Sequence, residues 1–335
     1  MPQTETKSLW LGFFAVTLFA LTLPMTKLAM GAQVGIQSGT YINGLSPWFI
    51  AFGRAAVAGI LSMLYLLSQK AAWPKGKQWM ILLAMSAGNV FGFPIFQGLG
   101  LLYVSASHAA VFNGILPLLT AVMSALLFRQ KPSLAFWLCA ALGGFLVAMF
   151  AVLRTGTLSL HWGDILIFSA VTFCAAGYAF GAKLSLEMPA PQALCWMLVL
   201  SLPVTLPASA LTFPSESVST SAWLGFFYLA SISMWFGMMV WYHALNIGGA
   251  IRVSQVQLLQ VFLSLLFAVP LLGEQLEGLT IGFALAVVAV ALAAVVAVEV
   301  EMAADTVAVG AASAAVVARV AVVAGATGLV GRAVL

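Results

Sequence analysis

The chain has very little charge. Asp, Glu, Lys and Arg together make up 7% of its 335 residues, whereas a soluble domain carries about 25%. Hydrophobic residues make up 63% and fall into long runs, which identifies a polytopic membrane protein. The net charge of +4 is compatible with nucleic-acid binding, but the thirteen Lys and Arg residues are spread between apolar runs. We therefore expect lipid as a partner and no nucleic acid.

Cysteine and histidine are scarce. The cysteines lie inside apolar runs without paired spacing, which indicates neither a disulfide framework nor a metal site. The three histidines form no metal-binding or catalytic spacing, and no nucleotide-binding loop is present. We therefore assign no cofactor, no metal and no catalytic residue, and we expect that the protein is not an enzyme. The cysteines are Cys139, Cys174 and Cys195.

Acidic residues are missing from the interior of the apolar runs. Asp164 and Glu277 belong to runs, but they lie where those runs begin. A proton-coupled exporter of lipophilic cations is expected to hold a carboxylate inside the membrane, so the sequence disfavours that class. The cations present suit a solute that carries a carboxylate. These cations are Lys27, Arg54, Lys183 and Arg252.

Ten apolar runs are each close to the roughly 20 residues that cross a bilayer. They cover residues 8–30, 47–67, 79–102, 107–128, 134–153, 163–183, 192–213, 222–246, 249–272 and 277–298. We predict an all-α integral membrane protein with ten transmembrane helices. Basic connectors place the N-terminus in the cytoplasm by the positive-inside rule, and we expect the inner (plasma) membrane.

The two halves of the chain repeat each other. A shift of 146 residues places Asn89, Phe93, Phe96 and Gln97 on Trp235, Met239, Tyr242 and His243, and a shift of 144 places His108 and Asn113 on Arg252 and Gln257. Spans one and six also correspond, since VTLFA at Val16 resembles VTFCA at Val171. Each half holds five spans, an odd number, so the halves must be inverted. We predict inverted five-helix repeats over residues 8–153 and 163–298.

Polar and aromatic side chains interrupt the runs of spans three, four, eight and nine. Polar groups inside a span are costly unless they face protein or a water-filled cavity, so these stripes predict a solute pathway. Hydrogen bonding that only joins helices is the alternative interpretation. The predicted substrate-binding residues are Asn89, Phe93, Phe96, Gln97, His108, Asn113, Trp235, Met239, Tyr242, His243, Arg252, Gln257 and Gln260.

Three segments carry a family resemblance: PWFIAFGRAAVAG, GLLYVSASHAAVFNGILPLLTAVMSALLFRQKP and YHALNIGGAIRVSQVQLLQVFLSLLFAVPLLGEQLEGLTIG. They resemble the EamA domain of the drug/metabolite transporter superfamily, in two tandem copies over about residues 8–298. The resemblance implies a cavity lined by spans one, three, four, six, eight and nine, peripheral spans five and ten, and export of amino acids and related metabolites. The family's Gly-Glu pair is Gly273 and Glu274, and we interpret Glu274 as a loop residue at a helix end.

Three basic side chains have two interpretations each. Arg54 lies about 10 Å along its helix from Pro47 and is either a structural anchor or a substrate contact. His108 begins span four, as an interfacial cap or as a hydrogen-bond donor at the cavity mouth. Arg252 occupies the repeat position of His108 and is either a solute ligand or a gate residue.

The tail, residues 299–335, lies outside the repeats. Its last residues, VAVVAGATGLVGRAVL, are similar to the start of a Rossmann domain but are too few for its βαβ unit, so they imply no cofactor.

We expect a secondary transporter, an exporter of small amphipathic metabolites such as amino acids, that works by alternating access. An exchanger of anionic metabolites or nucleotide derivatives is the alternative within transport. A channel and an integral-membrane enzyme acting on a lipid-linked substrate are the alternatives of other classes. The sequence leaves the oligomeric state open.

Overall fold

The computed structural model describes residues 3–31, 43–128, 134–155, 161–248 and 255–290, together with residues 293 and 296. All regular structure in these residues is helical. Seven apolar helices of 22 to 25 residues and three shorter ones stand in the ten predicted positions. Each long helix has the length and composition to cross a membrane.

The first repeat holds five spans. They are α1 (Gln3–Ala20) with α2 (Thr22–Met30), then α3 (Pro47–Ser68), then α4 (Gln78–Met85) with η1 (Ser86–Gly92) and α5 (Phe93–Gly100), then α6 (Ala106–Asn113) with α7 (Leu116–Phe128), and α8 (Leu134–Thr155).

The second repeat follows the same order. Its spans are α9 (Trp162–Leu184), then α10 (Ala190–Leu211), then α11 (Thr220–Phe227) with η2 (Tyr228–Gly237) and α12 (Met238–Gly248), then η3 (Gln255–Leu258) with α14 (Leu259–Leu272), and the helix Gly278–Val290.

Serine hydroxyls fix where several spans begin. Ser46 accepts a hydrogen bond from the backbone N–H of Phe49 at 3.1 Å, and Pro47 occupies the first helical position of α3. Ser105 caps α6 in the same way through the N–H of His108. Such caps satisfy backbone donors that have no partner inside the helix, so each of these spans begins at a defined residue.

The two repeats run in opposite directions. Lys27, near the end of α2, interacts electrostatically with Glu274, whose carboxylate accepts the backbone N–H of Ala106 at the start of α6. Asp164, near the start of α9, pairs with His108, which also lies in α6. The first span of one repeat therefore ends beside α6, where the first span of the other begins. The predicted fold class, ten transmembrane helices as two inverted five-helix repeats, is confirmed.

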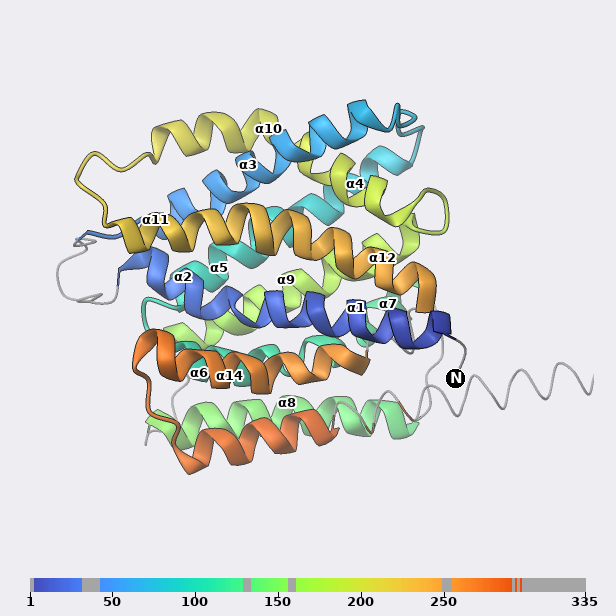
Figure 1. Ribbon diagram of the computed structural model, residues 1–335. Helices are drawn as coiled ribbons and strands as arrows, with labels where there is room; N and C mark the ends of the chain where they lie inside the picture. The colour runs from blue at the N-terminus through green and yellow to red at the C-terminus, as the bar shows by residue number, and fades with distance from the viewer. Residues whose placement is uncertain are drawn as a thin grey trace, which may run out of the picture.

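Spans five and ten lie at one edge of the bundle. Figure 1 shows α8 side by side with the helix Gly278–Val290, below α14. The rings of Phe150 and Phe283 join these two helices, with centroids 5.3 Å apart. The pair α3 and α10 lies at the opposite edge in the same view. The remaining spans lie between these two edges.

Both spans three and eight contain a π-helical segment, η1 and η2. With the repeat shift of 146 residues, η1 falls on residues 232–238, which overlap η2. π-helical turns are rare and are found frequently at functional sites. The two repeats are thus widened at the same level, next to the cavity described below.

Candidate functional site

A cavity lies inside the bundle, between the two repeats. Its described lining residues come from spans one, two, three, four, six, seven, eight and nine. The centres of water-sized spheres can occupy about 70 Å³ of it, which is room for several water molecules. Its polar lining residues are Thr22, Arg54, Asn89, Gln97, Asn113, Cys174, Tyr178, Ser233, Gln257 and Gln260.

Three amide side chains of the first repeat line the cavity with atoms that lack a partner. Both side-chain polar atoms of Asn89, Oε1 of Gln97 and Oδ1 of Asn113 are buried and make no hydrogen bond. A buried polar group left in this state costs about 1–3 kcal/mol. A solute that offers matching donors and acceptors would recover this free energy.

Arg54 is the charged side chain of the described lining. It is 7% exposed, and its Nε donates to Sδ of Met234 at 3.3 Å. No Asp or Glu stands among the lining residues that the structure describes. A buried charge without a counter-charge is strongly unfavourable in a closed protein interior, so the cavity has an electropositive site.

Small residues bring Arg54 to this position. The α3 face that contains Ala55, Ala58 and Gly59 is buried, which lets α3 pack closely on α10. A Cβ atom on Gly59 would lie 2.6 Å from Cδ2 of Leu202, so a larger residue would push the two helices apart. Close packing of α3 holds its arginine inside the bundle.

A second close contact places Asn89. A Cβ atom on Gly177 of α9 would collide with the Asn89 amide, and a Cβ atom on Gly88 would lie 2.5 Å from the carbonyl oxygen of Phe173. Glycine at both positions therefore allows η1 and α9 to approach until Asn89 reaches the cavity. The π-helical backbone of η1 contributes to the same placement, because Asn89 lies inside it.

The structure brings six of the predicted substrate-binding residues together around this cavity. Three belong to span three, one to span four and two to span nine, so both repeats contribute. They are Asn89, Phe93, Gln97, Asn113, Gln257 and Gln260.

Two predicted residues of the first repeat have other partners. The Phe96 ring stacks on Phe173, with centroids 5.3 Å apart. His108 is 3% exposed and pairs with Asp164, so it does not stand at a cavity mouth. The physical reason is the same for both residues: each side chain contacts a side chain of α9, Phe173 in one case and Asp164 in the other, and so points away from the cavity.

The predicted stripe of span eight does not line the cavity. Trp235, Met239 and Tyr242 pack in a hydrophobic cluster together with Leu198, and His243 is exposed. Arg252 lies outside the described residues, as does the tail, residues 299–335.

The lining residues of span eight are Ser233, Met234 and Met238 instead. The two methionines lie one position before Trp235 and Met239, the residues of the predicted stripe. A stripe calculated at 100° per residue assumes an α-helix, whereas η2 is π-helical with bonds between residues five apart. The different turn rotates the face that meets the cavity.

Thirteen of the described lining residues were not among the predicted site residues, although the sequence held a signal for four of them. Spans one and six correspond with a shift of 155 residues at VTLFA and VTFCA, which places Phe19 on Cys174 and Leu23 on Tyr178. All four line the cavity. The repeat of spans one and six therefore identifies two more equivalent pairs. Arg54 and the span-seven residues add two spans to the lining that the family resemblance implied.

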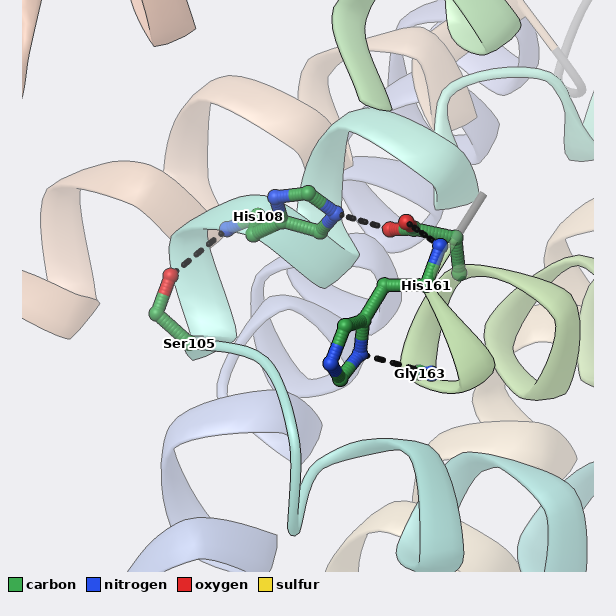
Figure 2. A network of polar contacts seen from close by, with 5 residues as sticks. Ser105, His108, His161 and Gly163 are labelled. Atoms are coloured by element: carbon green, nitrogen blue, oxygen red, sulfur yellow. Dashed lines mark hydrogen bonds and ion pairs between the residues drawn. The ribbon is translucent and has the colours of Figure 1, made fainter. Parts of the chain in front are cut away.

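One end of the bundle is closed by polar contacts between the repeats. Nε2 of His108 lies 2.6 Å from Oδ1 of Asp164, and Figure 2 shows this contact as a dashed line from the His108 ring to the unlabelled carboxylate. The other oxygen of Asp164 accepts the backbone N–H of His161 at 3.1 Å, which caps α9. Glu274 lies at this end too, and accepts the backbone N–H groups of Ala106 and Ser107 at 2.8 and 2.9 Å.

The sequence indicated only that Glu274 is a loop residue at a helix end, whereas the structure shows that its carboxylate also binds another helix. Its carboxylate, at the end of span nine, holds the N-terminus of α6, where the helix dipole favours negative charge. His108 and Asp164 are both almost fully buried at the same end. Both contacts join the first repeat to the second, so this end of the bundle opens only if they break.

Comparison with known proteins identifies the family. The model of the EamA-like transporter family matches residues 6–152 and 161–296. An uncharacterized transporter of Bacillus subtilis (strain 168), YdeK, is 37% identical over 293 residues, which cover 87% of this chain and 96% of that protein. An uncharacterized transporter of Archaeoglobus fulgidus is 23% identical over 265 residues, 75% of this chain and 90% of the other.

A solved crystal structure has the same fold. It superimposes with a TM-score of 0.56 and 17% sequence identity, and the match covers 87% of this chain and 95% of the other. At this identity the likeness concerns the fold alone. The family match over both halves, with the inverted repeats and the cavity between them, establishes that this chain belongs to the EamA-like transporter family.

Proposed function

We propose that the protein is a secondary transporter that exports small amphipathic metabolites, such as amino acids, by alternating access. Membership of a transporter family and a multi-pass membrane fold are the established part of this statement. The class of solute and the direction are the proposal. The bacterial relative supports the plasma membrane as its location.

The observation that carries the proposal is the cavity between the repeats. It joins unpaired amides and a buried guanidinium to apolar walls that include Phe93, Leu116 and Leu198. Such a mixture suits a solute with a polar end and an apolar body. Inverted repeats with a site between them are the architecture of transporters that rock one part against another.

The contacts at the closed end supply the part that has to move. In the proposed cycle, the pair of His108 with Asp164 and the bonds of Glu274 to α6 form when this end is closed and break when it opens. The two π-helical segments, η1 and η2, lie beside the cavity and absorb the change in helix direction. With the N-terminus in the cytoplasm, the closed end faces outward.

Counterflow tests the proposal. Purified protein is reconstituted into liposomes loaded with a mixed metabolite pool, and the retained and released compounds are identified by mass spectrometry. We expect amphipathic metabolites that carry a carboxylate to exchange in protein-containing liposomes and to stay in empty ones. The proposal is abandoned if no compound exchanges faster than in empty liposomes.

Arg54 favours a second candidate, an exchanger of anionic metabolites or nucleotide derivatives. A buried guanidinium at the cavity attracts anions of either class. The two candidates differ in the need for a counter-solute. An exporter releases solute into an empty compartment, whereas a strict exchanger does so only when a second anion is present outside.

A further inference from the structure

Among the described residues, the guanidinium of Arg54 has one hydrogen-bond partner, a weak one, and its two terminal nitrogens donate to none. Its Nε donates to the sulfur of Met234, and a thioether is a weak acceptor. Its electrostatic neighbours are the Cys174 thiol and the Tyr178 hydroxyl, which carry no charge in their ordinary state. The ion pair found in the described part of the chain is that of His108 with Asp164, which does not involve this arginine.

The free donors point to the kind of group that completes the site. With Nε committed to Met234, the two terminal nitrogens remain, and their N–H groups form a planar fork. This fork matches the two oxygens of a carboxylate in a bidentate contact. The neighbouring amides of Asn89 and Gln97, both more than nine-tenths buried, are unpaired and line the same cavity.

We propose that Arg54 binds the carboxylate of the transported solute and so selects solutes with one negative charge at the polar end. The assignment rests on the proposed function, because it concerns the same cavity. The described lining residues provide a single cation and no acid, so one carboxylate neutralises the site. A phosphate monoester carries −1.5 to −2 charges near neutral pH and would leave negative charge uncompensated.

The amides define what the rest of the solute offers. Oε1 of Gln97 and Oδ1 of Asn113 are unpaired acceptors, so they suit N–H or O–H donors elsewhere on the solute. Phe93 and Leu198 provide apolar contact for its body. The carboxylate contact at Arg54 is then the shared requirement, whereas the amides and apolar walls distinguish one carboxylate from another.

Three related compounds test the charge requirement. L-leucine carries a carboxylate and an ammonium group, 4-methylpentanoate keeps only the carboxylate, and L-leucinamide keeps only the cation. Their effects on thermal unfolding in detergent and their counterflow are measured for the wild-type protein, Arg54→Met, Arg54→Lys and Lys77→Gln. Lys77 is exposed, so the last variant removes an equal charge away from the cavity.

We expect compounds with a carboxylate to stabilise the wild-type protein and Lys77→Gln, and L-leucinamide to have no effect. Arg54→Met should bind these carboxylates about 10- to 100-fold more weakly, which is the loss of affinity expected when one hydrogen bond to a charged group is removed. Arg54→Lys should also bind more weakly, since lysine keeps the charge but lacks the fork. Without solute, Arg54→Met should unfold at the wild-type temperature or above, because removal of a buried unpaired charge breaks no internal ion pair.

The outcomes separate this assignment from the proposed function. If solute-free Arg54→Met unfolds at a lower temperature, the arginine is a structural anchor and the assignment is wrong. The assignment is also wrong if Arg54→Met binds carboxylates as tightly as the wild-type protein does, or if the wild-type protein exchanges only cations and uncharged compounds. If the wild-type protein exchanges no compound from the metabolite pool, the proposed function is wrong, and the carboxylate site that rests on it is wrong too.

Discussion

Asp164→Asn should loosen the closed end of the bundle. His108 and Asp164 are 3% and 1% exposed, and Nε2 and Oδ1 lie 2.6 Å apart. A hydrogen bond to a charged group contributes about 1.5–3 kcal/mol. Asparagine keeps the shape of aspartate, and its amide oxygen can still accept the N–H of His161, so the cap of α9 is preserved while the charge is lost.

A loss of this size should shift the balance between closed and open states by about 10- to 100-fold. Cysteine accessibility measures the shift. The three native cysteines are replaced by alanine, and a single cysteine is introduced at Ala109, which is 0% exposed beside His108. A membrane-impermeant maleimide added from the side of the closed end should label this cysteine faster when Asp164→Asn is present.

Glu187→Gln is the matched control. The Glu187 carboxylate accepts a hydrogen bond from Nε2 of Gln78 at 3.1 Å in an exposed position, away from α6. It should leave the labelling rate at Ala109→Cys unchanged. Equal labelling with and without Asp164→Asn would show that the His108 pair does not hold this end closed.

Three further predictions have defined outcomes. Asn89→Leu removes a buried amide without partners, so the free energy of unfolding of the solute-free protein, measured by denaturation, should rise by about 1 kcal/mol. Transport, measured by counterflow, should fall. A lower free energy of unfolding would contradict this prediction. Gly177→Ala should cost about 1–3 kcal/mol and slow transport, because the new methyl group meets Asn89. Gly144→Ala, where a Cβ atom meets nothing within 4 Å, should not destabilise in the same denaturation experiment, and equal losses for both glycines would refute the contact. Reporters placed before α1 and in residues 156–160 should appear on opposite sides of the membrane, since five spans separate them, and reporters on one side would refute the inverted repeat.

The number and order of the spans could be predicted because hydropathy and length decide them. An apolar run of some 20 residues with so little charge has few alternatives to a membrane span. The periodicity of span three also placed Asn89, Phe93 and Gln97 on one face, and the structure has all three at the cavity. Both predictions depend on local sequence alone.

The rest depends on distant contacts and on backbone geometry. The stripe of span eight was displaced because η2 is π-helical, which no residue pattern in it announces. Arg54 meets Met234 across 180 residues of chain, and His108 meets Asp164 across 56. Sequence periodicity places a side chain on a helix face but does not say which neighbour that face meets.

A native cysteine provides the most direct test of a solute site between the repeats. Cys174 lines the cavity, whereas Cys139 lies in α8, outside the described lining. The measurement is the rate at which a small thiol reagent modifies each cysteine, with and without the compound that counterflow identifies. At ten times its Kd the compound should slow modification of Cys174 about elevenfold and leave Cys139 unchanged. Equal rates at Cys174 with and without the compound would contradict the placement of the solute in this cavity.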